Sequence, residues 1–292
     1  MTLVIDFGTV NTVGMVDGRP VTVDGAPWLP SVVHSGVVGA DASLLGRGQE
    51  SRDLKASLEP SAVGAVFARM VSAARAQFGD VGDVVVTHPA VWSPTRVAVL
   101  ARAVGVAEVR TIPEPVALAA HLPAGEVALV VDAGGGTWDV AVVRDGVVLA
   151  GAAVPVDLDQ RIVERVRPSL SEPVKDDATR ADLLASARAG KELLSRHDIA
   201  EVVLPDHRAV RLTRAEFELL IAPDVTHLMA MVSEVTADVA VTRVLLAGGC
   251  GRIPLLALRL SAATGQQVTA DPEPETAVAR GAALLVRGRE TP

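Results

Sequence analysis

The chain of 292 residues has few of the residue types that support redox, zinc or single-strand-binding chemistry. It contains one cysteine, Cys250, which excludes an intramolecular disulfide, a thiolate zinc cluster and a dithiol redox pair. Aromatic residues make up 2% of the chain and tyrosine is absent, so the stacking surfaces that hold single-stranded nucleic acid are missing. The core must therefore be built from valine, alanine and leucine.

Basic residues are fewer than acidic ones. The chain has 27 lysines and arginines against 35 aspartates and glutamates, a net charge of −8, which argues against nucleic acid or an anionic membrane as a partner. No apolar run approaches the roughly 20 residues that span a bilayer. Residues 1–6 lead into an apolar strand without a basic leader. We therefore expect a cytoplasmic chain without a membrane span.

What the sequence does contain is an internal duplication. Residues 3–18 read as an apolar strand ending at Asp6, a glycine turn, a second strand and an Asp-Gly hairpin. Residues 129–146 repeat this order, with Asp132 at the end of the first strand. Asp-Gly between apolar runs is a strong hairpin signal. After each copy helices alternate with strands, which indicates α/β sheets covered by helices.

The duplication divides the chain into two lobes. We expect residues 1–122 to form lobe I and residues 123–292 to form lobe II. An insertion of about residues 169–221 has its own helix and hairpin, followed by the capping-box sequence Thr213-Arg-Ala-Glu216. It is predicted to be a small subdomain of lobe II.

The two strand-end carboxylates suggest phosphate chemistry. In a duplicated fold their turns would face each other across a cleft, where open α/β sheets place ligands. The run Gly134-Gly135-Gly136 removes every Cβ from the second turn, so backbone N–H groups can close on an anion, and Gly8-Thr9 does the same to a lesser extent. Carboxylates acting through water suit Mg²⁺, so a nucleoside triphosphate is the predicted ligand.

Each motif also has a plainer interpretation. A single glycine turn after a strand is more often simple turn chemistry than a phosphate site. The occurrence of two such turns at equivalent positions, with hydroxyls at Thr9 and Thr137 and a further carboxylate at Asp139, favours phosphate binding. A third glycine-rich segment, residues 245–254, can receive a flat ring under Arg252, or it can be an ordinary strand-to-helix turn.

Taken together, these motifs resemble the actin-like ATPases, and among them the nucleotide-binding domain of the seventy-kilodalton heat-shock (DnaK-like) chaperones. The resemblance runs through residues 6–9, 29–33, 87–92, 114–117, 132–139, 212–217, 248–254 and 277–283. It implies a two-lobed α/β fold of duplicated ribonuclease H-like lobes that binds ATP or ADP with Mg²⁺.

The resemblance also implies roles for individual residues. Asp6, Asp132 and Asp139 would place Mg²⁺, partly through water. Lys55 would contact the γ-phosphate and position the attacking water, unless it is a solvated surface charge, and Glu114 would sense the nucleotide. The expected catalytic set consists of Lys55, Glu114, Asp132 and Thr137. The residues expected to contact the nucleotide are Asp6, Gly8, Thr9, Val10, Gly134, Gly135, Gly136, Thr137, Lys191, Ser195, Gly248, Gly249, Cys250, Arg252 and Glu275.

The chain departs from the family pattern in several places. There is almost no room between Lys55 and the next helix for the subdomain that caps the first lobe, so that lobe should be open at its top. Val10 replaces a hydroxyl, and Val154-Pro155-Val156 replaces a Leu-Gly-Gly turn beside the phosphates. Arg188 and Glu192 exchange the family's charges. The chain also ends where a chaperone would continue into its peptide-binding domain.

These observations predict an ATP- and Mg²⁺-binding, chaperone-like switch domain with weak ATP hydrolysis, whose partners are a nucleotide and a protein or further domains of a longer chain. The alternative is a non-hydrolysing interaction module that has lost productive use of nucleotide. A small-molecule kinase ranks last because no acceptor-site base can be identified.

Overall fold

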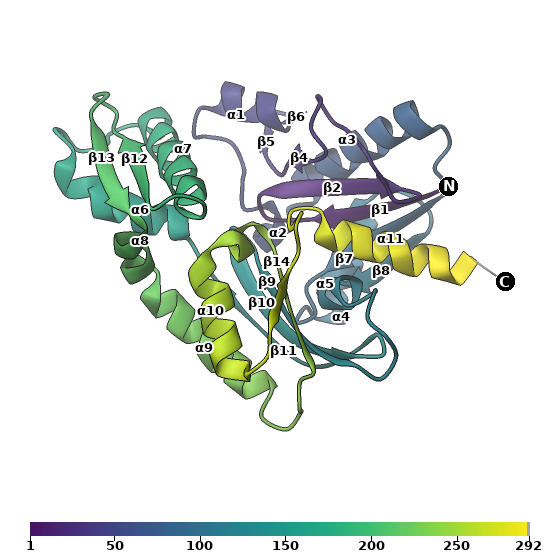
Figure 1. The fold of residues 1–292 in the computed structure, drawn as a ribbon. Helices are drawn as coiled ribbons and strands as arrows, with labels where there is room; N and C mark the ends of the chain where they lie inside the picture. The colour runs from purple at the N-terminus through teal and green to yellow at the C-terminus, as the bar shows by residue number, and fades with distance from the viewer. Residues whose placement is uncertain (291–292) are drawn as a thin grey trace.

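The structure, a computed structural model, describes residues 1–290 and is a mixed α/β protein with two main sheets (Figure 1). The first sheet has the order β3-β2-β1-β7-β8, with β4 also paired to β2. Its strands are β1 (Thr2–Phe7), β2 (Asn11–Val16), β3 (Arg19–Pro20), β4 (Leu29–Pro30), β7 (Asp83–His88) and β8 (Val109–Pro113).

The second sheet repeats this topology with the order β11-β10-β9-β14-β15. Its strands are β9 (Val127–Ala133), β10 (Thr137–Arg144), β11 (Val147–Pro155), β14 (Arg243–Ala247) and β15 (Val268–Ala270). In both sheets the first three strands are antiparallel and the last two run parallel to the first strand. The predicted fold of two sister lobes is confirmed.

The Asp-Gly hairpins form as their sequence predicts. Asp17 and Gly18 have φ values of 49° and 70°, and Asp145 and Gly146 have 50° and 74°. Positive φ at both central residues is the geometry of a type I′ turn, whose twist matches that of the two flanking strands.

Helices cover the outer faces of both sheets and also fill the space between them. α3 (Pro60–Phe78) begins at Glu59, whose carboxylate caps the first N–H groups, and it packs its buried side chains on the first sheet beside α4 (Pro94–Ala103). α9 (Ala222–Val235) packs on the second sheet and α10 (Pro254–Thr264) packs on α9 and β14.

Two further helices, α5 (Glu114–Leu118) and α11 (Ala277–Glu290), pack on each other between the sheets. The apolar cluster around them includes Val4 and Val85 of the first sheet and Val130 and Leu245 of the second. α11 lies along β1 and β2, so the last described helix returns to the first sheet (Figure 1).

The insertion stands beside the second sheet. It contains α7 (Asp177–Leu194), β12 (Ile199–Val203), β13 (Ala209–Thr213) and α8 (Arg214–Leu220), and it follows α6 (Leu158–Val166) and the 3₁₀ segment η1 (Arg167–Ser169). Thr213 and Glu216 form the reciprocal capping box that the sequence predicts. The lobe limits 1–122 and 123–292 and the subdomain limits 169–221 stay predictions.

The first lobe lacks a cap subdomain, as expected. Only two residues separate α2 (Leu54–Ser57) from α3. The segment before α2 forms a small hairpin, β5 (Val33–His34) and β6 (Val37–Val38), and a short helix, α1 (Ala40–Gly46). The backbone of Gly48 in lobe I packs against the carbonyl group of Asp177 at the start of α7, so closely that a Cβ on Gly48 would collide with it. This contact narrows the expected opening at the top of the lobe. Within residues 1–290, no helix combines the length and the hydropathy that crossing a bilayer requires.

Candidate functional site

A cavity of about 410 Å³ lies between the two sheets and the inserted subdomain. Its walls come from the two glycine turns, α2, α5, α7, the 3₁₀ segment η2 (Gly249–Arg252) and the loop before α11. Of the residues predicted for the site, those that line it are Asp6, Gly8, Thr9, Val10, Lys55, Glu114, Asp132, Gly134, Gly135, Thr137, Asp139, Lys191, Ser195, Gly248, Gly249, Cys250, Arg252 and Glu275.

Gly136 is the predicted residue that does not line the cavity, and the reason is a contact between the two turns. A Cβ on Gly136 would lie 2.6 Å from Cγ2 of Thr9, and a Cβ on Gly135 would lie 2.7 Å from Cγ2 of Val10. Both distances are far shorter than real Cβ contacts allow. Glycine is therefore favoured at both positions because the turns touch, and the expected contact of the Gly136 backbone with a nucleotide stays a prediction.

The glycine turns have equivalent hydrogen bonds. The N–H of Gly8 donates to the carbonyl oxygen three residues ahead at 3.0 Å, and the N–H of Gly134 makes the corresponding bond at 2.9 Å. These two donors are used within the hairpins, so they do not face an anion. The N–H groups of Gly135 and Gly136 find no protein acceptor among residues 1–290, which leaves them as candidate anion donors.

Four carboxylates and one ammonium group meet at the inner end of the cavity. Nζ of Lys55 lies 2.7 Å from Oε1 of Glu114, and both side chains are buried. Asp6, at the end of β1, accepts a hydrogen bond from Thr87 Oγ1 at 2.7 Å. Asp132 and Asp139 come from β9 and β10, where they are directly paired across the antiparallel ladder. One cation against four acidic groups leaves an excess of negative charge.

The electrostatics of this cluster show in the pKa of its members. Burial raises the pKa of Asp132 to about 7, with the neighbouring Asp139 adding to the shift and Lys55 opposing it. Burial likewise raises the pKa of Glu114 well above its ordinary value, again against the charge of Lys55. Burial lowers the pKa of Lys55, but the carboxylates of Glu114, Asp6 and Asp139 outweigh burial and raise it overall. Lys55 therefore remains charged.

The donor set of this cluster fits a hard divalent cation held mainly through water. Carboxylate oxygens are the ligands that Mg²⁺ prefers, and Mg²⁺ usually keeps several waters. Among the described residues no group of three or more acidic, histidine or cysteine side chains is arranged to hold a metal directly. The expectation that Asp6, Asp132 and Asp139 place Mg²⁺ partly through water stays a prediction.

Lys55 is held in place by residues outside the cavity. Its backbone carbonyl accepts a hydrogen bond from Arg96 Nη2 at 2.9 Å, and the same guanidinium donates to the carbonyl of Ala56. The Arg96 guanidinium carbon lies 4.3 Å from the centre of the Trp92 ring, a cation–π contact. Arg96 of α4 thus fixes the backbone of α2, the helix that carries the lysine.

The outer end of the cavity is lined by α7 and the third glycine-rich segment. Asp159 at the start of α6 pairs with Lys191 Nζ at 2.6 Å and with Arg188 Nε at 2.9 Å. Gly248 has φ +77°, and a Cβ there would lie 2.5 Å from Oδ1 of Asp132, so this turn packs directly on the acidic cluster.

Sequence reasoning missed several residues that line the cavity or hold its residues in place. Asn11 and Arg196 line the cavity although they had no assigned role, and each is adjacent to a motif residue, which is a signal that could have found them. The bond from Thr87 to Asp6 joins parallel strands β7 and β1 and has no local sequence signal. Asp159, at the start of α6, pairs with Arg188 and Lys191 of α7, and this contact between two helices has no local sequence signal either.

Comparison with known proteins finds similarity over most of the chain. The family model described as Hsp70 protein matches residues 47–287. The chain is 31% identical over 242 residues to the chaperone protein HscA homolog of Bordetella petrii, which covers 73% of this chain and 39% of that protein. It is 30% identical over 301 residues to the chaperone protein HscA of Yersinia pseudotuberculosis, covering 94% of this chain and 45% of that protein. The chain thus spans less than half the length of these relatives.

Proposed function

Because this chain belongs to the Hsp70 family, we propose that it is an ATP-binding, Mg²⁺-dependent switch domain with weak ATP hydrolysis. The observation that carries the proposal is the contact of the two glycine turns beside a buried Lys55–Glu114 pair and three further carboxylates. Two touching turns with N–H donors form a cradle for a polyphosphate, and the acidic cluster supplies the charge that attracts its cation.

Each residue has a defined task in this proposal. Gly135 and Gly136 donate their N–H groups to phosphate oxygens, and the hydroxyls of Thr9 and Thr137 bond phosphate oxygens or their waters. Asp6, Asp132 and Asp139 hold the waters of Mg²⁺, which when bound neutralises the phosphate charge. Lys55 places its ammonium against the γ-phosphate and orients the attacking water. Catalysis then rests on positioned charge and in-line geometry without a strong base.

The coupling to a partner is proposed through the Lys55 region. Lys55 pairs with Glu114 at the start of α5, and Arg96 holds the backbone of Lys55 from the segment that follows Pro89. A γ-phosphate that draws Lys55 from Glu114 would change the contacts of both segments. We propose that a protein partner or further domains respond to this change in contacts. The relatives that support this proposal are named chaperone proteins.

A second candidate is an interaction module that binds nucleotide without hydrolysing it. The observation that favours it is the reduced number of polar donors beside the turns. Val10 packs its methyl group on Gly135 where a hydroxyl is expected, and Pro155, which has no N–H, is the strand partner of Thr137.

Two experiments test the proposal. In the first, ATP with Mg²⁺ is titrated calorimetrically into the wild-type chain and the Asp132→Asn variant. Tight binding that weakens in the variant supports the site, and equal heats from both proteins overturn it. In the second, steady-state phosphate release is measured for the wild type and Lys55→Ala. Release above background only in the wild type supports hydrolysis, and background release in both supports the interaction module.

A further inference from the structure

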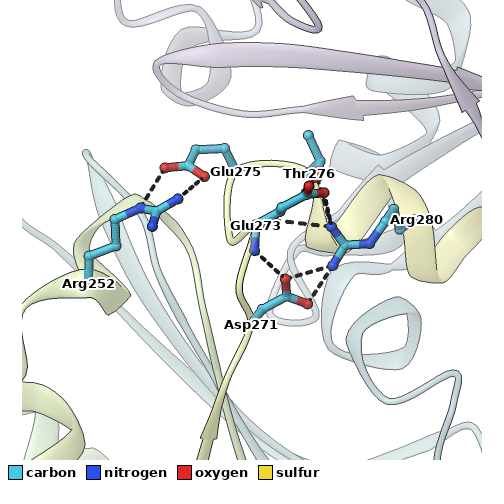
Figure 2. Close-up of polar contacts among 6 residues, drawn as sticks. All are labelled: Arg252, Asp271, Glu273, Glu275, Thr276 and Arg280. Atoms are coloured by element: carbon cyan, nitrogen blue, oxygen red, sulfur yellow. Dashed lines mark hydrogen bonds and ion pairs between the residues drawn. The ribbon is translucent and has the colours of Figure 1, made fainter.

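The loop between β15 and α11 holds a polar network just outside the cavity (Figure 2). Arg280, in the first turns of α11, donates from Nη2 to both carboxylate oxygens of Asp271 at 2.6 and 2.7 Å. Its Nη1 donates to Glu273 Oε2 at 2.8 Å and to Thr276 Oγ1 at 3.0 Å. One guanidinium therefore ties the beginning, the middle and the end of the loop to the helix.

The same loop is anchored to the second sheet. The N–H of Asp271 donates to the carbonyl oxygen of Leu246 in β14 at 3.0 Å, and the N–H of Glu273 donates to Asp271 Oδ1 at 2.8 Å. β14 continues into the glycine-rich turn that begins at Gly248. β14 thus holds the loop and the glycine-rich turn in a fixed position relative to each other.

Glu275 is a residue of this loop that lines the cavity. Its two oxygens accept from Nε and Nη2 of Arg252 at 2.9 and 2.8 Å, and both side chains line the cavity (Figure 2). The paired charges raise the pKa of Arg252 and lower that of Glu275 despite its partial burial. A bidentate carboxylate engages the edge of a guanidinium and leaves its flat faces free to stack on an aromatic ring.

We propose that Arg280 is a positioning residue for the nucleobase: through Asp271 and the loop it fixes Glu275, which fixes the plane of Arg252 under the base. Arg280 and Asp271 do not line the cavity, so they act through residues that do, of which Glu275 is the one that binds Arg252. This inference rests on the proposed function, because it requires that the outer end of the cavity receives the base of ATP. Pre-positioning matters because Arg252 otherwise loses rotamer freedom when the ligand binds.

The test compares a ligand that has a base with one that lacks it. ATP and inorganic tripolyphosphate, each with Mg²⁺, are titrated into the wild-type chain, Arg280→Met, Arg280→Lys and Asp271→Asn. The readout is the ratio of the two dissociation constants, since a general loss of folding weakens both ligands together. Arg243→Met is the matched control, because Arg243 also donates two hydrogen bonds to one carboxylate, that of Glu126, away from the cavity.

We expect the preference for ATP over tripolyphosphate to fall about tenfold in Arg280→Met, the lower end of what losing a ligand-holding partner costs. Arg280→Lys should lower it too, since one ammonium group cannot hold Asp271 and also reach both Glu273 and Thr276, which Arg280 binds through its second nitrogen. The control should keep the wild-type ratio. If Arg280→Met does not fold, the ratio of dissociation constants in Arg280→Lys and Asp271→Asn tests the inference instead.

Two results would overturn the inference. If the wild type prefers ATP and the variants keep that preference, Arg280 does not position the base and the proposed function stands. If the wild type binds neither ligand, the proposed function fails and this inference fails with it.

Discussion

Thr9 and Gly136 are in contact across the two halves of the molecule: a Cβ on Gly136 would lie 2.6 Å from the Thr9 methyl carbon and 3.3 Å from its hydroxyl oxygen. The equivalent turns of the sister lobes thus form one surface. Their separation is set by van der Waals contact, so it is sensitive to a single added methyl group.

The first prediction concerns this contact. Gly136→Ala forces the turns apart, so we expect ATP to bind more weakly, on the order of tenfold to a hundredfold, because phosphate donors on both turns are displaced. The free energy of unfolding should fall by about 1–3 kcal/mol from overpacking. Gly82→Ala is the control, since Gly82 has open space around its Cβ position and no positive φ. Unchanged ATP affinity in Gly136→Ala would show that the turns do not hold the phosphates together.

The second prediction concerns Lys55. Lys55→Met removes the ammonium while keeping a side chain of similar length, so we expect phosphate release to fall about a hundredfold because a positioned charge at the reacting phosphate is lost. Lys175→Met is the matched control, because Lys175 is exposed, pairs with the exposed Glu172 and does not line the cavity. Equal loss in both variants would assign the effect to something other than the site.

The third prediction concerns pH. The pKa of Asp132 is about 7 in the folded chain against 3.8 ordinarily, so the folded state holds more protons than the unfolded state between these values. Stability therefore falls as pH rises through that window, by about 2 kcal/mol between pH 5.5 and 7 for this group. Urea unfolding at pH 5.5 and 8 should show a smaller loss in Asp132→Asn than in the wild type. Identical losses would contradict the assigned pKa.

The fourth prediction concerns the top of the cleft. Gly48 touches the Asp177 carbonyl at the start of α7, the helix that carries Lys191 and ends just before Ser195. Gly48→Ala should push α7 outward and increase the rate of nucleotide dissociation, on the order of tenfold if overpacking costs about 1–2 kcal/mol. Gly36→Ala is the control, since Gly36 also has positive φ but no neighbour within 4 Å. Stopped-flow release of a fluorescent ATP analogue measures the dissociation rate in both variants. Equal rates in Gly48→Ala and Gly36→Ala would show that the contact between Gly48 and α7 does not slow nucleotide dissociation.

The fold and most of the cavity lining could be predicted because their signals are local. Asp-Gly hairpins, strand-end aspartates and glycine runs are read within a few residues, and their repetition reveals two sister lobes. The role of Gly136 could not be read this way, since it depends on Thr9 in the other lobe. Arg280 was equally hidden, because a single arginine near the start of a helix shows nothing of the loop that it binds.

The most direct test of the account is a crystal structure with a non-hydrolysable ATP analogue and Mg²⁺. The account predicts that the triphosphate lies between residues 8–10 and 134–137, with the metal waters on Asp6, Asp132 and Asp139 and the base against Arg252. A triphosphate bound elsewhere, or turns that separate and leave the analogue unbound at saturating concentration, would contradict it.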